Sequence, residues 1–193
     1  PAATPASLLA ESRRFEQRHS PAAAALVRPH APDRSPGRRL RVGYLSPDLR
    51  QHSCAYFLEA LLAAHDRDAF ELFAYAEVRR PDAVTARLRA AVDHWLDVGE
   101  MTDQALTARI REDRIDLLVD LAGHTSNGRM GVLARRAAPV QLSWLGYPDT
   151  TGLAAVDYRI TDAVADPPGD SDAHHTEELP VSYTHLRAHE THS

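Results

Sequence analysis

The stretch of sequence that decides the fold is Arg41-Val-Gly-Tyr-Leu-Ser-Pro-Asp-Leu-Arg-Gln-His52. Its apolar first half is typical of a buried strand, and an apolar pattern with helical spacing begins near Ala55, just beyond it. A strand that ends in a polar loop just before a helix is where α/β proteins place their chemistry. Asp48 and His52 stand four residues apart in this loop, so they are a candidate pair for proton transfer.

From this stretch onward, strand-like and helix-like runs alternate along the chain. The predicted strands are Leu40–Leu45, Phe70–Ala76, His94–Val98, Ile115–Leu121, Val140–Leu145 and Val156–Thr161. The predicted helices between them are Ala55–His65, Asp82–Ala91, Thr102–Arg111 and Arg129–Arg135. Such alternation is the signature of βαβ units. We therefore predict an α/β fold, a Rossmann-like and mostly parallel sheet with helices on both faces.

The two ends of the chain differ from this pattern. Residues 6–19 predict an amphipathic helix, and the proline-rich stretch 20–39 has the composition of a linker. Residues beyond 179 have no apolar periodicity and resemble a translated sequencing adapter. The predicted organisation is a helix and linker over 1–38, a Rossmann-like half-domain over 39–178 and a disordered tail over 179–193.

The composition excludes several classes of function. The net charge of −5 gives no basic surface for nucleic acid, and no apolar run approaches the ~18 residues of a membrane span. The chain has no Lys, no P-loop, no Gly-x-Gly-x-x-Gly fingerprint and no Gly-x-Ser-x-Gly motif. Its single cysteine rules out an internal disulfide, and no secretory signal is present, so we expect a cytoplasmic protein.

No functional metal site is expected. The chain has none of the Cys and His spacings of zinc sites. The spacing of His185, His189 and His192 in the tail would allow metal binding, and we regard it as accidental.

Three polar loops follow predicted strands, namely Ser46–Cys54, Gly123–Gly128 and Gly146–Gly152. Because the carboxyl ends of parallel strands lie at the same edge of a sheet, we expect these loops to converge there. This convergence is the physical argument for a site. The second loop leads into a predicted helix, whose free N–H groups could receive an anion or a sugar hydroxyl.

Each of these residues also has a purely structural interpretation, which stays open at this point. Asp48 could cap the following helix, and His52 could be a hydrogen-bonded structural histidine. Cys54 suits the role of a small packed residue better than that of a nucleophile. The loop glycines could serve only as turn residues.

Four blocks of sequence resemble a known family. They are Arg39–His52, Asp116–Thr125, Ala138–Pro148 and Asp157–Asp162, and they resemble, in this order, the start of the catalytic region of O-linked N-acetylglucosamine transferases. Bacterial and SPINDLY-like members are included in that family. The resemblance covers residues 39–178, and the helix over 6–19 is similar to the family's segment between its tetratricopeptide repeats and its catalytic region.

The resemblance implies an inverting glycosyltransferase of the two-Rossmann-domain (GT-B) type. Such an enzyme would move N-acetylglucosamine from UDP-GlcNAc to Ser or Thr hydroxyls of proteins, with no metal or other cofactor. The family's catalytic Asp and His, beside the reacting sugar, fall on Asp48 and His52. The substrate-binding positions fall on Thr125, Leu145 and Gly146. To these we add Tyr147, which follows Gly146, and Cys54 of the first loop.

Some features depart from the family pattern. Ser53 and Cys54 stand where the family often has Pro and a small residue, and Asp149 stands where it usually has Gly. The third loop would bend differently if that position required a positive φ.

The chain as given also lacks two parts that the resemblance implies. One is the second Rossmann domain, which would bind most of the UDP-sugar, and the other is the repeat array that would recruit protein acceptors. We therefore expect this chain alone to be inactive. Two alternatives are a noncatalytic Rossmann-like module for protein interaction or nucleotide-sugar binding, and an inverting GT-B enzyme with a small-molecule acceptor.

Overall fold

The fold is built on one six-stranded parallel sheet, seen in a computed structural model that describes residues 4–24, 29–31, 33–167 and 169–180. The strands lie in the order β3-β2-β1-β4-β5-β6, and every pair of neighbours is parallel. The strands are β1 (Leu40–Ser46), β2 (Phe70–Ala76), β3 (His94–Asp97), β4 (Leu117–Asp120), β5 (Val140–Trp144) and β6 (Tyr158–Ile160). This arrangement confirms the predicted α/β fold.

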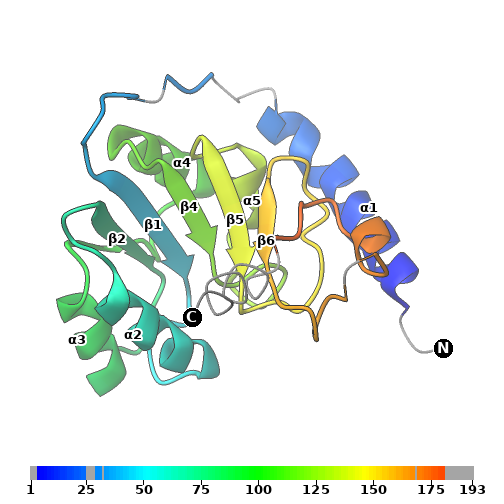
Figure 1. The fold of residues 1–193 in the computed structure, drawn as a ribbon. Helices are drawn as coiled ribbons and strands as arrows, with labels where there is room; N and C mark the ends of the chain where they lie inside the picture. The colour runs from blue at the N-terminus through cyan, green and yellow to red at the C-terminus, as the bar shows by residue number, and fades with distance from the viewer. Residues whose placement is uncertain (1–3, 25–28, 32, 168, 181–193) are drawn as a thin grey trace, which may run out of the picture.

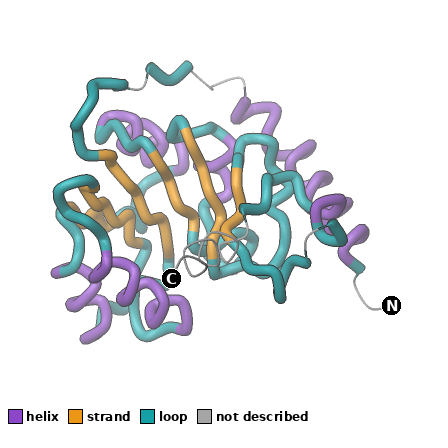
Figure 2. Tube along the Cα trace, viewed as in Figure 1, coloured by secondary structure: helices purple, strands orange, loops and turns teal. Residues whose placement is uncertain are grey.

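Helices cover both faces of the sheet (Figure 2). They are α1 (Pro5–Ala24), α2 (Ser53–Ala64), α3 (Ala83–Ala90), α4 (Asp103–Glu112) and α5 (Met130–Ala134), with a 3-10 turn, η1, at Asp172–His174. Leu58 of α2 and Leu88 of α3 belong to one apolar core, which also holds Val42 of β1. Leu106 of α4 and Leu133 of α5 belong to the other core. Strands covered on both faces are largely apolar, which is why these runs were recognisable in the sequence.

The predicted bounds need small corrections. Strand β4 is shorter at both ends than the predicted Ile115–Leu121. Just before its start, the Asp116 carboxylate accepts the Arg41 N–H at 2.9 Å and pairs with Arg38 at 2.7 Å, while the Asp116 backbone N–H donates to the Arg41 carbonyl. Helix α2 begins two residues before the predicted Ala55.

Helix α1 is longer than predicted and packs on the sheet domain. It continues through Ala24, so the linker begins later than residue 20. Ser12 is buried and Glu16 accepts the Ala154 N–H at 2.7 Å. Gly152, with φ of 72°, permits this approach, because a β-carbon there would lie 2.5 Å from that of Ser12. Residues 181–193, including the three tail histidines, lie outside the described part of the chain, and the division into three parts stays a prediction.

The strand order places a switch point between β1 and β4. From β1 the chain proceeds outward to β2 and β3, then returns to place β4 on the other side of β1. All arrowheads in Figure 1 point to one edge of the sheet. Ligands of open α/β sheets bind at this carboxyl edge, next to the switch point. The loops after β1, β4 and β5 all leave the sheet there, as the sequence predicted.

Candidate functional site

The first loop is held by His52, which caps helix α2. Its Nδ1 atom accepts the Cys54 N–H at 3.3 Å. Since a backbone N–H can only donate, Nδ1 carries no proton and the neutral ring has its proton on Nε2. The cap is therefore His52, and the structural interpretation that assigned this role to Asp48 is wrong.

Asp48 faces the protonated side of the His52 ring. Its Oδ2 lies 3.9 Å from Nε2 of His52, and its Oδ1 accepts from Nη2 of Arg50 at 3.1 Å. The Asp48 side chain is 18% exposed and that of His52 is 35% exposed, so both reach solvent. The structure brings the predicted pair close together, with Nε2 of His52 facing the Asp48 carboxylate at 3.9 Å, beyond hydrogen-bond distance.

Asp82 anchors the first loop from outside, and sequence reasoning missed it. Its carboxylate accepts the Gln51 N–H at 2.8 Å and, as the cap of α3, the Thr85 N–H at 2.9 Å. These N–H groups lower the pKa of Asp82. The pattern Asp-x-x-Thr before a helix is a capping signal, but nothing local indicates that the same carboxylate also holds Gln51.

Cys54 lies buried at the start of α2, behind the Asp48–His52 pair. Burial raises the pKa of the thiol, and the negative charge of Asp48 raises it further. A thiol that stays protonated is a poor nucleophile, so its environment suits packing rather than covalent chemistry.

The second loop begins with a buried carboxylate that sequence reasoning also missed. Asp120 ends β4 and is 1% exposed, with its Oδ2 accepting the Gly123 N–H at 2.6 Å. Its Oδ1 has no hydrogen-bond partner among the described residues. Burial raises the pKa of Asp120 to about 6, although the N–H groups of Gly123 and Ala122 act in the opposite direction. Further along, the Thr125 hydroxyl donates to the Ala122 carbonyl at 2.8 Å.

The second and third loops interlock through glycines. A β-carbon at Gly146 would lie 1.8 Å from the Leu121 carbonyl oxygen. One at Gly123, where φ is 56°, would lie 2.5 Å from the β-carbon of Tyr147. Direct backbone contact, rather than turn chemistry alone, therefore requires both glycines.

Leu145, directly before the third loop, has a left-handed backbone with φ of 66°. A leucine in this conformation is uncommon and must be held by its surroundings. Asp149 has no positive φ, so an Asp fits where the family usually has Gly. We expected Asp149 to alter the bend of the third loop only if this position required a positive φ. The position does not have a positive φ, so that condition is not met.

Tyr147 packs between the loops. Its ring meets the edge of the His124 ring with centroids 5.3 Å apart, and His124 Nε2 lies 2.7 Å from the Thr151 carbonyl oxygen. Burial, and then the charge of Asp149, raise the pKa of the Tyr147 phenol. His124 is thus a hydrogen-bonded structural residue that joins the two loops.

Arg129 holds the far end of the second loop. It pairs with Glu77, after β2, and with Asp103, at the start of α4, the latter at 3.0 Å. It also donates to the Val98 carbonyl at 3.1 Å, after β3. One partly buried guanidinium therefore ties the end of the second loop to the segments that follow β2 and β3.

The candidate site is the carboxyl edge formed by these loops. Pairing of Leu45 with Asp120 brings the first and second loops side by side. Within the described ranges, no hydrogen bond or ion pair joins Asp48 or His52 to the second or third loop. A cavity of about 540 Å³ lies at the opposite edge, where Arg38 and Asp116 help to line it, and it contains none of the predicted site residues.

Neither a metal-binding cluster nor a membrane-spanning helix occurs among the described residues. No group of three or more His, Cys, Asp or Glu side chains could hold a metal ion in the part of the chain that the structure describes. Among those same residues, no helix has the length and apolar character needed to cross a membrane.

Comparisons with known proteins agree on one family. The profile of "Glycosyl transferase family 41" matches residues 25–185. "Probable UDP-N-acetylglucosamine--peptide N-acetylglucosaminyltransferase SPINDLY" of Solanum lycopersicum is 47% identical over 148 residues, which are 75% of this chain and 16% of that protein. The UDP-N-acetylglucosamine–peptide N-acetylglucosaminyltransferase of Caenorhabditis elegans is 36% identical over 68% of this chain and 12% of its own length.

A solved structure supports the same relationship. A mutant of the Thermobaculum terrenum O-GlcNAc transferase superimposes with a TM-score of 0.84 and 43% identity. The match covers 92% of this chain and 34% of that one. The chain therefore spans about a third of the solved relative, and 16% of the length of the tomato relative.

Proposed function

The chain belongs to glycosyl transferase family 41, and from this premise we propose that it forms one wall of the catalytic cleft of an inverting GT-B glycosyltransferase. The enzyme would transfer N-acetylglucosamine from UDP-GlcNAc to Ser or Thr hydroxyls of proteins. The names of the tomato and nematode relatives support this donor and acceptor. The observation that carries the proposal is the Asp48–His52 pair at the carboxyl edge of β1, next to the switch point.

Asp48 is the proposed proton acceptor. An acceptor hydroxyl must lose its proton as the new glycosidic bond forms. The Asp48 carboxylate has acceptor oxygens only, and the hydrogen bond from Arg50 to one of them fixes its orientation. The neutral His52 ring offers Nε2–H as a donor, which suits a contact to a sugar oxygen better than proton abstraction.

The remaining predicted residues would bind substrate. Thr125 supplies a hydroxyl from the second loop, whereas Leu145 and Gly146 supply closely packed backbone from the third. Tyr147 and Cys54 would shape the wall through packing, as their burial and raised pKa values indicate.

Further parts of the cleft would come from sequence that the relatives have outside the matched segment. A second Rossmann domain would hold most of the UDP-sugar, and helical repeats would present protein acceptors. We propose that no metal takes part. A cytoplasmic location suits a protein whose one cysteine is a buried thiol.

The test uses this protein extended to the length of its relatives. Purified protein is incubated with radiolabelled UDP-GlcNAc and protein acceptors, with and without EDTA, beside a panel of other nucleotide sugars. The proposal expects incorporation at Ser or Thr that persists in EDTA and is lost in Asp48→Asn.

Other outcomes would overturn it in distinct ways. Binding of nucleotide sugar without transfer to any acceptor would indicate the noncatalytic module. Transfer to small molecules and never to protein would indicate the other class of GT-B enzyme. Loss of activity in EDTA, restored by a divalent cation, would contradict the metal-free mechanism.

A further inference from the structure

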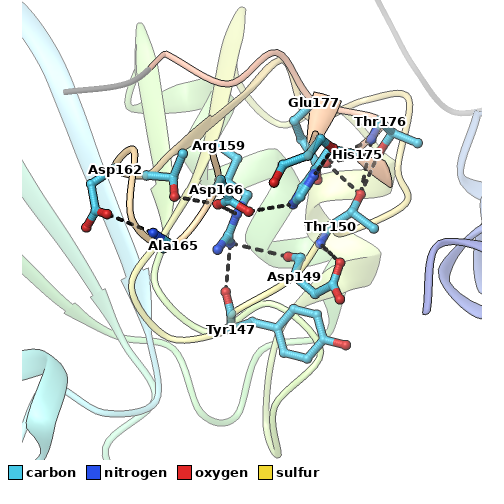
Figure 3. A network of polar contacts seen from close by, with 12 residues as sticks. Tyr147, Asp149, Thr150, Arg159, Asp162, Ala165, Asp166, His175, Thr176 and Glu177 are labelled. Carbon is cyan, nitrogen blue, oxygen red and sulfur yellow. Dashed lines mark hydrogen bonds and ion pairs between the residues drawn. The ribbon is translucent and has the colours of Figure 1, made fainter. Parts of the chain in front are cut away.

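A buried polar cluster lies behind the third loop and takes no part in the chemistry proposed above. After β6 the chain turns back, so that Thr176 and Glu177 bond to Thr150 and Thr151 of the third loop (Figure 3). The side chains of Arg159, Asp166 and His175 are 7%, 8% and 5% exposed. Burying charged groups is costly unless each finds partners, so the partners of this cluster indicate its role.

Arg159 holds the backbone of the third loop directly. Its Nη1 donates to the Tyr147 carbonyl at 2.8 Å and lies 3.3 Å from that of Asp149. In Figure 3 the guanidinium sits between these carbonyls and a carboxylate. A planar guanidinium presents several N–H groups in fixed directions, which a lysine ammonium cannot reproduce.

Asp166 orients that guanidinium from the other side. Its Oδ2 lies 3.4 Å from Nε of Arg159 and also accepts from the Thr161 hydroxyl. His175 donates from Nδ1 to the Ser171 carbonyl at 3.0 Å, which places its Nε2 3.7 Å from Oδ1 of Asp166. Side chains therefore bond Oδ2 of this carboxylate, whereas Nε2 of His175 makes no hydrogen bond among the described residues.

Glu177 provides a second anchor for the third loop, at Thr150 and Thr151. It accepts the Thr150 hydroxyl at 2.6 Å and the Thr151 N–H at 2.7 Å, and its contact with the Thr151 hydroxyl completes the set. Residues 147–151 are therefore held from behind at two places.

Arg159 also supports the second loop indirectly, through Tyr147. Tyr147, whose carbonyl Arg159 binds, packs its side chain on Gly123 and on the ring of His124. On the other side of Tyr147 lies Leu145, whose left-handed backbone requires support. Moving the Tyr147 carbonyl would therefore disturb both loops at once.

We propose that Arg159, oriented by Asp166, is a positioning residue that keeps the third loop in its substrate-binding shape. The inference rests on the proposed function, because it assigns the loop to substrate. Arg159 itself touches no reacting atom in this scheme; it acts through Tyr147 and Asp149.

The experiment compares Arg159→Met with Arg136→Met in the extended protein. Arg136 pairs with Asp157 at 2.8 Å and donates to the Ala155 and Pro139 carbonyls, so it makes the same kinds of bonds. It lies at the opposite ends of β5 and β6, away from the candidate site. Both variants therefore lose an ion pair and bonds to two backbone carbonyls, at two different places, with Arg136 30% exposed and Arg159 7% exposed.

The first readout is amide hydrogen exchange. Arg159→Met should speed exchange over residues 145–151 by about tenfold or more, relative to peptides from β1 and β2 of the same sample. Asp166→Asn should speed exchange in the same segment by a smaller factor. Arg136→Met should leave that segment at the wild-type rate. Equal exchange over 145–151 in both Met variants would overturn the proposal.

The second readout is kinetic. Arg159→Met should lower kcat/KM by about tenfold, mainly through KM, because the loop binds substrate while Asp48 is untouched. Arg136→Met should leave KM unchanged, and Arg159→Lys should recover little. If the wild-type protein transfers no sugar, the proposed function fails, yet the exchange comparison still decides whether Arg159 holds the loop. If transfer occurs and both Met variants share one KM, the positioning role is wrong.

Discussion

Gly146 lies directly against the backbone of Leu121. A β-carbon at this position would lie only 1.8 Å from the Leu121 carbonyl oxygen, so there is no room for one. Leu121 follows β4 and Gly146 follows β5, so this contact joins the chain segments that leave two neighbouring strands. It makes the second and third loops one unit, which Arg159 holds from behind. The first loop reaches the same edge independently, through the pairing of Leu45 with Asp120.

Substitution of Gly146 should therefore destabilise the fold. Gly146→Ala forces the two loops apart, and we expect the free energy of unfolding to fall by about 2 kcal/mol or more. Gly99→Ala is the matched control, because its nearest neighbour would be Cγ of Glu77 at 3.9 Å. That variant should stay within ~0.5 kcal/mol of wild type. Urea unfolding measures both, and equal losses would contradict the close contact.

Two substitutions of His52 separate its capping role from its chemical role. His52→Ala removes the acceptor for the Cys54 N–H and should lower the free energy of unfolding by about 1 kcal/mol. His52→Asn restores a good capping side chain and should restore that stability, while sugar transfer by the extended protein stays impaired. Full activity of His52→Asn would show that this histidine serves only as a cap.

Substitution of Asp48 should remove the proton acceptor. Asp48→Asn is expected to lower transfer by the extended protein by about 100-fold or more, with unchanged KM for the donor. Asp97→Asn is the control, since Asp97 also ends a strand at this edge but lies on β3, away from the switch point. Initial rates of transfer measure both variants, and an equal effect would argue against a specific role for Asp48.

Asp120 should make stability depend on pH in an unusual direction. Burial raises its pKa from 3.8 to about 6, so between about pH 4 and pH 6 the folded state binds the proton more tightly than the unfolded state. Its contribution therefore destabilises the fold as pH rises through this range, by on the order of 2 kcal/mol. Relative to wild type, the free energy of unfolding of Asp120→Asn should therefore be higher at pH 7.5 than at pH 4.

Asp162→Asn provides a control of opposite sign. The N–H groups of Ala165 and Val164 lower the pKa of Asp162, so its contribution stabilises the fold above its ordinary pKa and is lost as pH falls. Urea unfolding at pH 7.5 and pH 4, as differences from wild type, measures the Asp120 effect, and a further measurement at about pH 2.5, below the ordinary pKa of Asp162, measures the loss of its contribution. A difference for Asp120→Asn that does not change with pH would contradict the raised pKa.

The sequence was most informative about the sheet. Strand β2 has the predicted bounds, Phe70–Ala76, because its run is apolar except for Glu71 and its last five residues are buried. The prediction for β4 was longer than the strand, because the buried apolar residues Ile115 and Leu121 extend the run beyond the residues assigned to the strand. The candidate pair Asp48 and His52 could be found because both residues lie in one short loop.

Other site residues could not be found in this way. Asp120 reads as part of an apolar strand, and only its burial and its unpartnered oxygen distinguish it. Arg159 stands in a short strand with nothing local to connect it to Tyr147. Asp82 is recognisable as a cap, but its bond to the Gln51 N–H depends on where α3 packs.

By itself, the sequence determined the order of strands and helices, and with it the parallel sheet and the edge where polar loops gather. Periodicity and capping are local properties of the chain, so one sequence suffices to read them. Only the tertiary structure decided which groups meet at that edge: Gly146 against Leu121, Arg159 on the Tyr147 carbonyl, and His52 with its Nε2 toward Asp48. These contacts depend on how whole strands and loops pack in space, and no local pattern encodes that packing.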